Sequence, residues 1–329
     1  MADTSAPRSR WLTLAGWRNL FRDRPIIPLL ILLALLVIAS ELARPGIVSP
    51  NWAGVILRAA VPLAILAGAQ TLSMLTAGID LSVGAVASMS GFLVATLVAD
   101  QGLVMAIVIA LLAAAASGLV TGIGVGVFRV HPLIMTLGMS LVVLGLANVW
   151  QIMMVQTGAG VPPELRTLGS ELWFDVVPVS LIVFVPIAIA ILGGLRRTGY
   201  GRLLYAVGDN PVAARLSGTK PWQVLIALYV ITAVLAGVAG FIYTGYANTA
   251  SVTLVESQVL PSVAAAVIGG TSILGGRGGF GGTIIGALIL TVATSLLSSL
   301  GYPEAVRQIL FGSIIVVVAA AYSRVTAES

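Results

Sequence analysis

A single acid, Asp80, stands inside a long apolar part of the chain, in the sequence Gly78-Ile-Asp-Leu-Ser-Val-Gly84. Its carboxylate could cap the backbone amides of a helix that begins at Ser82 or Val83. It could also mark a broken helix whose backbone lines a solute pathway, or belong to a proton relay. A relay needs a second acid or a histidine nearby, and no other acid or histidine of the apolar segments faces Asp80. The pattern therefore favours a helix break with Asp80 as its cap.

A second break is predicted at residues 269–283, which contain eight glycines in 15 residues. Glycine disfavours a regular helix, so we expect a tight turn where backbones pack closely. A glycine-rich loop can also cradle phosphate, but here no lysine follows it and no strand precedes it, so nucleotide binding is not predicted. Small residues four apart in the next helix favour close helix packing. The residues expected to form the turn are Gly275, Gly276, Arg277 and Gly278.

The composition identifies an integral membrane protein. Of 329 residues, 58% are hydrophobic and 9% are charged, whereas a soluble domain has about 25% charged residues. The chain has no cysteine and one histidine, His131, so thiolate and multi-histidine metal sites are excluded. Its one lysine, Lys220, does not stand in a phosphate-binding loop. The net charge of +5 comes from residues between apolar runs rather than from one face, so it does not predict nucleic-acid binding. No catalytic residue and no metal site are predicted.

The apolar runs predict an all-α, polytopic fold with about ten transmembrane helices, some of them broken. A membrane-spanning helix needs about 20 apolar residues. The run at 260–273 is short and contains Pro261, which makes it the weakest of the set. The expected spans are 26–43, 59–77, 82–99, 103–127, 133–155, 176–194, 222–246, 260–273, 281–300 and 306–323.

The positions of the basic residues predict the topology. If the N-terminus is cytoplasmic, all 17 basic residues except Arg44, Arg58, Arg166 and Arg307 fall on the cytoplasmic side. Both termini are then inside, and the outer side carries most of the acids. The domains expected from this pattern are a basic N-terminal segment, 1–25, a single transmembrane domain, 26–323, and a cytoplasmic tail, 324–329.

The basic N-terminal segment has two interpretations. Residues 9–23 place tryptophans and leucines at helical spacing between arginines, which predicts an amphipathic helix on the lipid surface. A disordered basic tail has a similar composition. The apolar run that follows has no convincing cleavage site, so we interpret it as a retained first helix rather than a signal peptide.

Two loops are long enough to carry function. The outer loop, 157–175, could meet a soluble partner or could simply connect two spans. The inner loop, 195–221, contains Asn210 followed by Pro211, which is a typical helix start, and Gly218, which is a typical helix stop. We therefore predict a short helix of about two turns lying among arginines on the cytoplasmic side.

The two glycine-broken segments occupy comparable places in the two halves of the chain. Paired interruptions of this kind indicate an internal repeat and a pathway near the middle of the membrane. Polar side chains inside the spans could hydrogen-bond a neutral, polyhydroxylated solute, or they could bond across helices. The residues predicted to form the pathway and its helix break are Gln70, Gly78, Asp80, Ser82, Gly84, Asn148 and Gln151.

Three motifs together resemble one family, the ribose-type permease subunits of bacterial ABC importers, within the wider group that includes branched-chain amino-acid permeases. They are the stretch Gly78–Gly84, the loop Tyr205-Ala-Val-Gly-Asp-Asn-Pro-Val-Ala-Ala-Arg-Leu-Ser-Gly218, and the glycine-rich segment from Gly269 to Leu290. The resemblance covers about residues 50–320. The chain departs from the family pattern at Asp209, where a second glycine is frequent, and at Thr219, where a branched apolar residue is usual.

The resemblance implies an assembly in the bacterial inner membrane. Two permease subunits, the same or homologous, would form the pore, and a periplasmic binding protein would deliver the solute. A cytoplasmic ATPase would bind ATP and magnesium, so this chain would hold no cofactor and would not itself be an enzyme. The chain would import a monosaccharide or a similar neutral solute by alternating access. The residues implied to couple it to the ATPase are Asn210, Ala213, Ala214, Arg215 and Gly218.

The alternative is an ion-coupled secondary carrier or a channel that works without an ATPase. Such a protein usually needs several acids or a histidine inside its spans. Asp80 is the one residue here that qualifies, which favours the ATP-driven permease.

Overall fold

The structure is a computed structural model that describes residues 26–154 and 160–327, with side chains described up to residue 316. The one sheet in this part is a two-stranded hairpin, and every other element is a helix, so the all-α fold is confirmed. The interfacial helix predicted within residues 1–25 lies outside the described residues. The elements are α2 (Ile26–Ala43), α3 (Pro50–Leu75), α4 (Val83–Gln101), α5 (Leu103–Gly126), α6 (Pro132–Met154), α7 (Pro163–Ser170), β1 (Leu172–Trp173), β2 (Val177–Pro178), α8 (Leu181–Arg197), α9 (Gly199–Asp209), α10 (Pro211–Leu216), α11 (Pro221–Ala247), η2 (Glu256–Gln258), α12 (Val259–Ile268), α13 (Phe280–Ser299) and α14 (Glu304–Ala327).

Seven of the described helices are long and apolar enough to cross a membrane, and the bent pair α8–α9 would make eight. The chain is therefore a multi-pass membrane protein, although the predicted ten spans exceed this count. The segment predicted at 260–273 forms only the ten-residue helix α12, which is about 15 Å long and half the thickness of the hydrocarbon core. The span predicted at 306–323 falls within α14, whose side chains are described only in its first half.

Helix α3 begins nine residues before the predicted start of its span. Ser49 caps it by accepting a hydrogen bond from the Trp52 amide at 3.2 Å, and Pro50 occupies its first turn. Arg58, predicted to lie outside the span, is inside this helix. Its guanidinium donates to the Ser170 carbonyl at 2.6 Å and lies over the Tyr246 ring. These partners stabilise the half-buried Arg58 within the helix. The position of a single charge in the sequence did not predict this arrangement.

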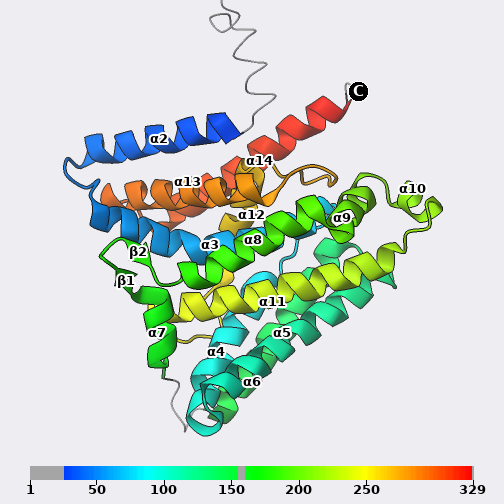
Figure 1. Ribbon diagram of the computed structural model, residues 1–329, viewed down its shortest axis with the longest axis horizontal. Coiled ribbons are helices and arrows are strands. Elements are labelled where there is room, and N and C mark those ends of the chain that lie inside the picture. Colours follow the sequence, from blue (N-terminus) through cyan, green and yellow to red (C-terminus); the bar gives the residue numbers. More distant parts are fainter. Residues whose placement is uncertain (1–25, 155–159, 328–329) are drawn as a thin grey trace, which may run out of the picture.

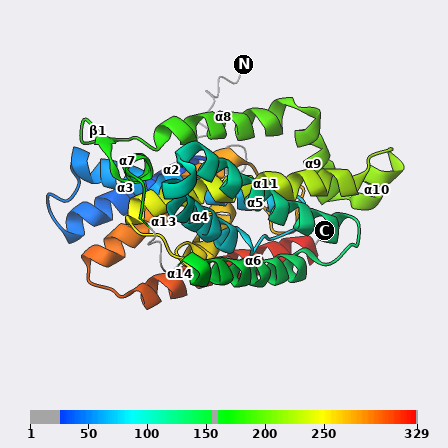
Figure 2. The ribbon, with the colours of Figure 1, turned by 90° about the horizontal axis from the view of Figure 1, so that it is seen from below.

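Helices α3, α4 and α11 form the centre of the molecule. In the apolar 18-residue stretch of each of these helices, between 61% and 72% of the residues are buried. The corresponding share is 6% for α2 and 22% for α5 and α6. Helix α11 packs against α3, α4 and α5, and α13 packs against α3, α12 and α2. Figure 2 shows α8 along one side of the molecule and α6 and α14 along the opposite side. The central helices are therefore those that carry or adjoin the predicted breaks.

The two long loops lie at opposite ends of the molecule. Figure 1 shows α7, β1 and β2 at one end of the long axis and α9 and α10 at the other, with the C-terminal end of α14 on the side of α10. The predicted outer loop thus contains a short helix and a hairpin. The predicted inner loop contains α9 as well as the expected short helix, and α9 turns away from α8 by 69°. Thr198 stabilises the bend, since its hydroxyl oxygen donates to the Gly194 carbonyl and accepts from the Gly201 amide.

Both predicted glycine breaks are present. Helix α3 ends at Leu75 and α4 begins at Val83, while α12 ends at Ile268 and α13 begins at Phe280. The two broken pairs meet in the core, where the hydroxyl groups of Thr71 on α3 and Thr283 on α13 are 2.7 Å apart. Each pair consists of a helix, a break and a second helix, as an internal repeat would require. The repeat itself stays a prediction.

Candidate functional site

The break between α3 and α4 is held by local hydrogen bonds to Asp80. The Asp80 carboxylate accepts from the Ser82 amide at 2.9 Å and from the Ser82 hydroxyl at 2.6 Å. Asp80 and Ser82 are 2% and 4% exposed, so the carboxylate lies in the protein interior. The predicted cap is therefore present, although it holds the turn before α4 rather than the first amides inside that helix.

Gln70 on α3 binds the backbone of the break from one side. Its amide nitrogen donates to the Asp80 carbonyl at 2.6 Å, and its amide oxygen accepts from the Asp80 N–H at 3.2 Å. Both bonds are buried, because Gln70 and Asp80 are almost completely enclosed. A buried backbone N–H or C=O is costly without a partner. Gln70, predicted as a pathway residue, therefore acts in this structure as a support of the break.

Two threonines from other helices, which were not among the predicted site residues, complete the support. Thr136 on α6 accepts from the Leu81 amide at 3.1 Å and donates to the Ile79 carbonyl at 3.2 Å. Thr232 on α11 donates to the second Asp80 carboxylate oxygen at 3.3 Å. Both are buried polar residues within apolar spans, which is the signal that could have found them.

The glycines at each side of the break are in close contact with other segments. A side chain at Gly78 would meet the hydroxyl of Tyr229 on α11 at 3.0 Å and Pro132 at the start of α6. A side chain at Gly84 would overlap Val259 at the start of α12. The predicted residues Gly78, Asp80, Ser82 and Gly84, together with Gln70, therefore form one packed unit.

The glycine-rich turn is built mainly by its own backbone. Gly275, Gly276 and Gly278 have positive φ angles of 86°, 69° and 132°, which residues with side chains rarely adopt. The Ser272 amide donates to the Arg277 carbonyl at 3.0 Å and closes the turn, while the Arg277 side chain is exposed. The turn thus has the predicted position, and the predicted close backbone packing continues into α13, where a side chain at Gly286 would overlap the Ala265 carbonyl.

The two breaks meet at Gly208, near the end of α9. The Gly276 amide donates to the Leu75 carbonyl at 3.0 Å, so the turn is bonded directly to the end of α3. A side chain at Gly208 would overlap the same carbonyl oxygen, and one at Gly275 would meet the Gly208 carbonyl and the Ala77 amide. Three distant segments therefore touch through their backbones. Gly208 belongs to the motif Tyr205–Gly218, but its role at this junction was not predicted from the sequence.

Helix α10 has the predicted start and stop. The Asn210 side-chain oxygen accepts from the amides of Val212 and Ala213 at 3.0 and 2.9 Å, and Gly218 has a φ angle of 87°. Of the other predicted coupling residues, Ala213 and Arg215 are exposed, and Ala214 is buried against the rest of the protein. Asp209 lies against Gly276, which has no side chain to exclude it.

Two apolar side chains of α10, not chosen from the sequence, are exposed. Val212 is 63% exposed and Leu216 is 85% exposed. An apolar residue in a polar loop is the signal that could have identified them. Together with Ala213 and Arg215 they give this short helix an outer surface suited to contact with another protein.

Asn148 and Gln151 are not part of the break. Both lie on exposed positions of α6, and the Asn148 amide donates to the Leu144 carbonyl at 2.8 Å. The same helix exposes large apolar residues such as Leu141 and Ile152. The predicted pathway residues thus separate into a buried group at the break and an exposed pair on α6.

No metal site is evident in the described part of the chain, where no three His, Cys, Asp or Glu residues come close enough to hold an ion. The polar groups of Gln70, Asp80, Ser82 and Thr136 are engaged at the break, whereas the buried Tyr229 hydroxyl beside Gly78 has no hydrogen-bond partner among the described residues. The arrangement is suited to fixing a helix break and joining it to α9 and α10, rather than to bond chemistry.

Comparison with known proteins gives consistent matches over most of the chain. Residues 53–319 match the family described as branched-chain amino acid transport system / permease component. The ribose import permease protein RbsC of Escherichia coli (strain K12) is 35% identical over 290 residues, which cover 86% of this chain and 87% of that protein. No solved structure gives a significant match.

Two further relatives have different names. The fructose import permease protein FrcC of Rhizobium meliloti is 30% identical over 301 residues, or 89% of this chain and 84% of that protein. The autoinducer 2 import system permease protein LsrC of Yersinia enterocolitica serotype O:8 / biotype 1B is 32% identical over 281 residues, or 82% and 76%. The multi-pass helical fold, the two glycine breaks and these matches lead to one conclusion: the chain belongs to the branched-chain amino acid transport system / permease component family.

Proposed function

We propose that this chain is the permease subunit of an ATP-binding cassette importer that moves a monosaccharide or a similar neutral, polyhydroxylated solute into the cytoplasm. The relatives named for ribose, fructose and autoinducer 2 support this class of solute. The buried break also supports it, because the Asp80 carboxylate accepts hydrogen bonds from Ser82 and Thr232 and so has a structural role in holding the break.

The observation that carries the proposal is the direct connection between α10 and the helix break. Helix α10 follows α9 without a linker, since Asn210 is both the end of one helix and the cap of the next. Gly208, two residues earlier, touches the end of α3 where the break begins. A displacement of α10 would therefore be transmitted to the α3–α4 break over a short path of backbone contacts.

A separate cytoplasmic ATPase is the partner that would displace α10. The exposed Val212 and Leu216 would enter a groove on that partner, while Ala213 and Arg215 would contact its rim. In this assembly α9, α10 and both termini face the cytoplasm, as the basic residues of loop 195–221 favour. ATP and magnesium would bind to the ATPase and not to this chain.

The solute pathway would form against the exposed face of α6, opposite a second permease subunit. Asn148 and Gln151 would offer hydrogen bonds to hydroxyl groups, and the neighbouring apolar side chains would pack against the second subunit or the sugar ring. The buried residues Gly78, Asp80, Ser82 and Gly84 would shape the moving break behind this pathway. A periplasmic binding protein would deliver the solute on the opposite side, where α7 and the hairpin lie.

Reconstitution tests the proposal. The chain, the ATPase and the binding protein encoded with it are placed in vesicles, and uptake of radiolabelled ribose and fructose is measured with and without ATP. We expect uptake that requires ATP and the binding protein. Gly218→Pro should abolish uptake while the chain still inserts into the membrane, because the left-handed turn that ends α10 would be lost. Uptake driven by an ion gradient in the chain alone would instead identify a secondary carrier and refute the proposal.

A further inference from the structure

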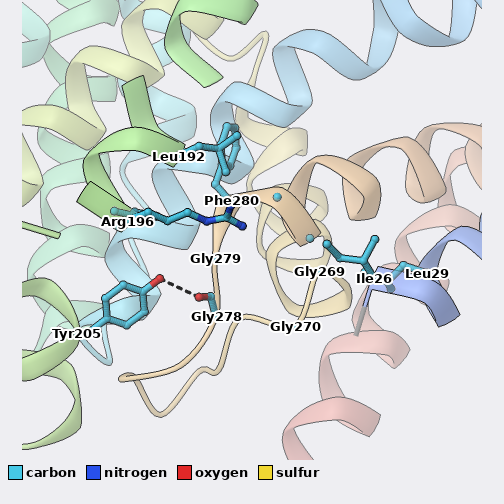
Figure 3. Close-up of a pocket in the computed structure, with 13 residues that line it drawn as sticks. Ile26, Leu29, Leu192, Arg196, Tyr205, Gly269, Gly270, Gly278, Gly279 and Phe280 are labelled. Atoms are coloured by element: carbon cyan, nitrogen blue, oxygen red, sulfur yellow. Dashed lines mark hydrogen bonds between the residues drawn. The ribbon is translucent and has the colours of Figure 1, made fainter. Parts of the chain in front are cut away.

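A pocket of about 320 Å³ lies where α2, the end of α8 and the start of α13 meet (Figure 3). Its volume is within the range of small-molecule sites. None of its lining residues is acidic. Phe280, at the start of α13, contributes an aromatic ring, and the first turn of α2 and the last turns of α8 contribute aliphatic side chains. These side chains are Ile26, Leu29, Leu192 and Leu195.

Arg196 supplies the positive charge of this pocket. Its side chain is exposed, and Figure 3 shows it extending from α8 toward Phe280. Within the described residues Arg196 makes no ion pair, since the one ion pair there joins Arg307 and Glu304. The Tyr205 hydroxyl, also in the pocket, already donates to the Gly278 carbonyl at 2.9 Å. Among the residues that the structure describes, Arg196 is therefore a cation of the pocket whose donors have no partner.

The rest of the wall leaves room for a headgroup. Gly279, Gly281 and Gly282 line the pocket without side chains. A Cβ at Gly281 would approach nothing closer than Leu192, at 3.8 Å. Gly279 precedes α13 and has no side chain to cap the first amides of that helix. These amides add donors beside Arg196, but the cavity and the Arg196 guanidinium are what define the site.

Because the pocket lies at the ends of apolar helices, we place it near the membrane surface, beside the peripheral helix α2. It is formed by helix ends, where the apolar spans of α2, α8 and α13 meet polar segments. Helix α2 is peripheral, because Ser40 is its one buried residue. Its exposed residues Leu30, Ile31 and Leu35 would contact acyl chains. Because α2 exposes apolar side chains beside the pocket, membrane lipid is the ligand that we expect there.

We propose that this pocket binds an anionic phospholipid. The lipid phosphate lies on the Arg196 guanidinium, which can donate two parallel hydrogen bonds to phosphate oxygens. The acyl chains follow Ile26, Leu29 and Leu192 toward the outer surface of α2. Basic pockets between membrane helices are suited to such headgroups. The site is independent of the solute and of the ATPase, so its test is separate from the test of transport.

Thermal unfolding of the full chain in detergent tests the proposal, with phosphatidylglycerol added as probe and phosphatidylcholine as reference. Retained phosphatidylglycerol is also counted by native mass spectrometry. We expect phosphatidylglycerol to raise the midpoint of the wild type and Arg196→Gln to lose this shift. Retention should weaken about tenfold, equivalent to about 1.4 kcal/mol, because the charged hydrogen bonds from Arg196 to the phosphate are lost. Arg197→Gln is the matched control, because Arg197 is exposed next to the pocket but does not line it.

A second pair of variants tests the apolar wall. Leu29→Trp fills the pocket and should also remove the shift, whereas Leu30→Trp faces outward from α2 and should preserve it. Equal shifts in the wild type and Arg196→Gln would overturn the proposal. If Arg197→Gln lowers the shift as much as Arg196→Gln, the lipid is attracted by surface charge in general and not by this pocket. That result would also overturn the proposal. A shift produced by inorganic phosphate alone would identify a free anion as the ligand and contradict the lipid.

Discussion

The two breaks of this permease occupy equivalent places in the chain but are stabilised in different ways. The break between α3 and α4 is held by side chains from three helices, namely Gln70, Thr136 and Thr232. The turn between α12 and α13 is held by backbone contacts that only glycine permits, as at Gly269 and Gly282. Side-chain hydrogen bonds can be exchanged for others during a conformational change, whereas interlocked backbones are rigid. We therefore infer that the first break moves and that the second is a fixed support.

The largest effect is expected at Gly208, where both breaks meet. Gly208→Ala places a methyl group on the Leu75 carbonyl, and neither backbone can withdraw without separating α9 from α3. Because overpacking of this kind costs about 3 kcal/mol, we expect a lower unfolding midpoint and loss of ATP-driven uptake. Gly193→Ala on α8 is the control, since a side chain there meets nothing within 4 Å. Equal uptake by the two variants would contradict the role of the junction.

The rigidity of the second turn can be tested at two adjacent glycines. Gly282→Ala would overlap the Gly269 carbonyl, and we expect it to destabilise the chain by about 2 kcal/mol. Gly281→Ala has open space and should leave stability almost unchanged. Thermal unfolding in detergent measures both. If the two substitutions have the same effect, α12 and α13 are not interlocked as described.

The first break should depend on Gln70. Gln70→Leu keeps the size of the side chain but leaves the Asp80 N–H and C=O buried without partners. Each such group costs about 1–3 kcal/mol, offset in part by relaxation of the break, so we expect a net loss of about 2 kcal/mol. The same substitution at the exposed Gln151 should not lower the unfolding midpoint. An unchanged unfolding midpoint in Gln70→Leu would show that the two hydrogen bonds between Gln70 and the Asp80 backbone contribute little to stability.

The smallest effect is expected at the cap of α10. Asn210→Ala removes the bonds to the Val212 and Ala213 amides and should destabilise this helix locally by about 1 kcal/mol. The global midpoint should stay the same, while amide hydrogen exchange in α10 becomes faster and uptake per ATP hydrolysed falls. Asn210→Ser, which can still cap, should restore both. If hydrogen exchange in α10 becomes faster but uptake does not change, the Asn210 cap stabilises the helix without contributing to coupling with the ATPase.

Much of the architecture could be predicted from the sequence because membranes impose strong rules on composition and length. The apolar runs located the helices, and the glycines located both breaks. The residues Asn210, Pro211 and Gly218 specified α10 by local chemistry alone. Prediction from the sequence failed where groups from distant segments offset a locally unfavourable feature, such as a charge within an apolar helix. Arg58 lies inside α3 because Ser170 and Tyr246 accept it, and α12 is too short to span because the chain turns at Gly269 and Gly270.

The sequence by itself determined that this protein is a helical membrane protein with two helix breaks and a short capped helix at residues 211–216, because these features depend on local patterns of apolar residues, glycines and caps. Only the tertiary structure decided that Thr136 and Thr232 hold the first break, that Gly208 joins both breaks to α10, and that Arg196 lines a pocket beside α2. Those contacts join residues from distant segments. Their partners are set by how the helices pack, which no single segment encodes.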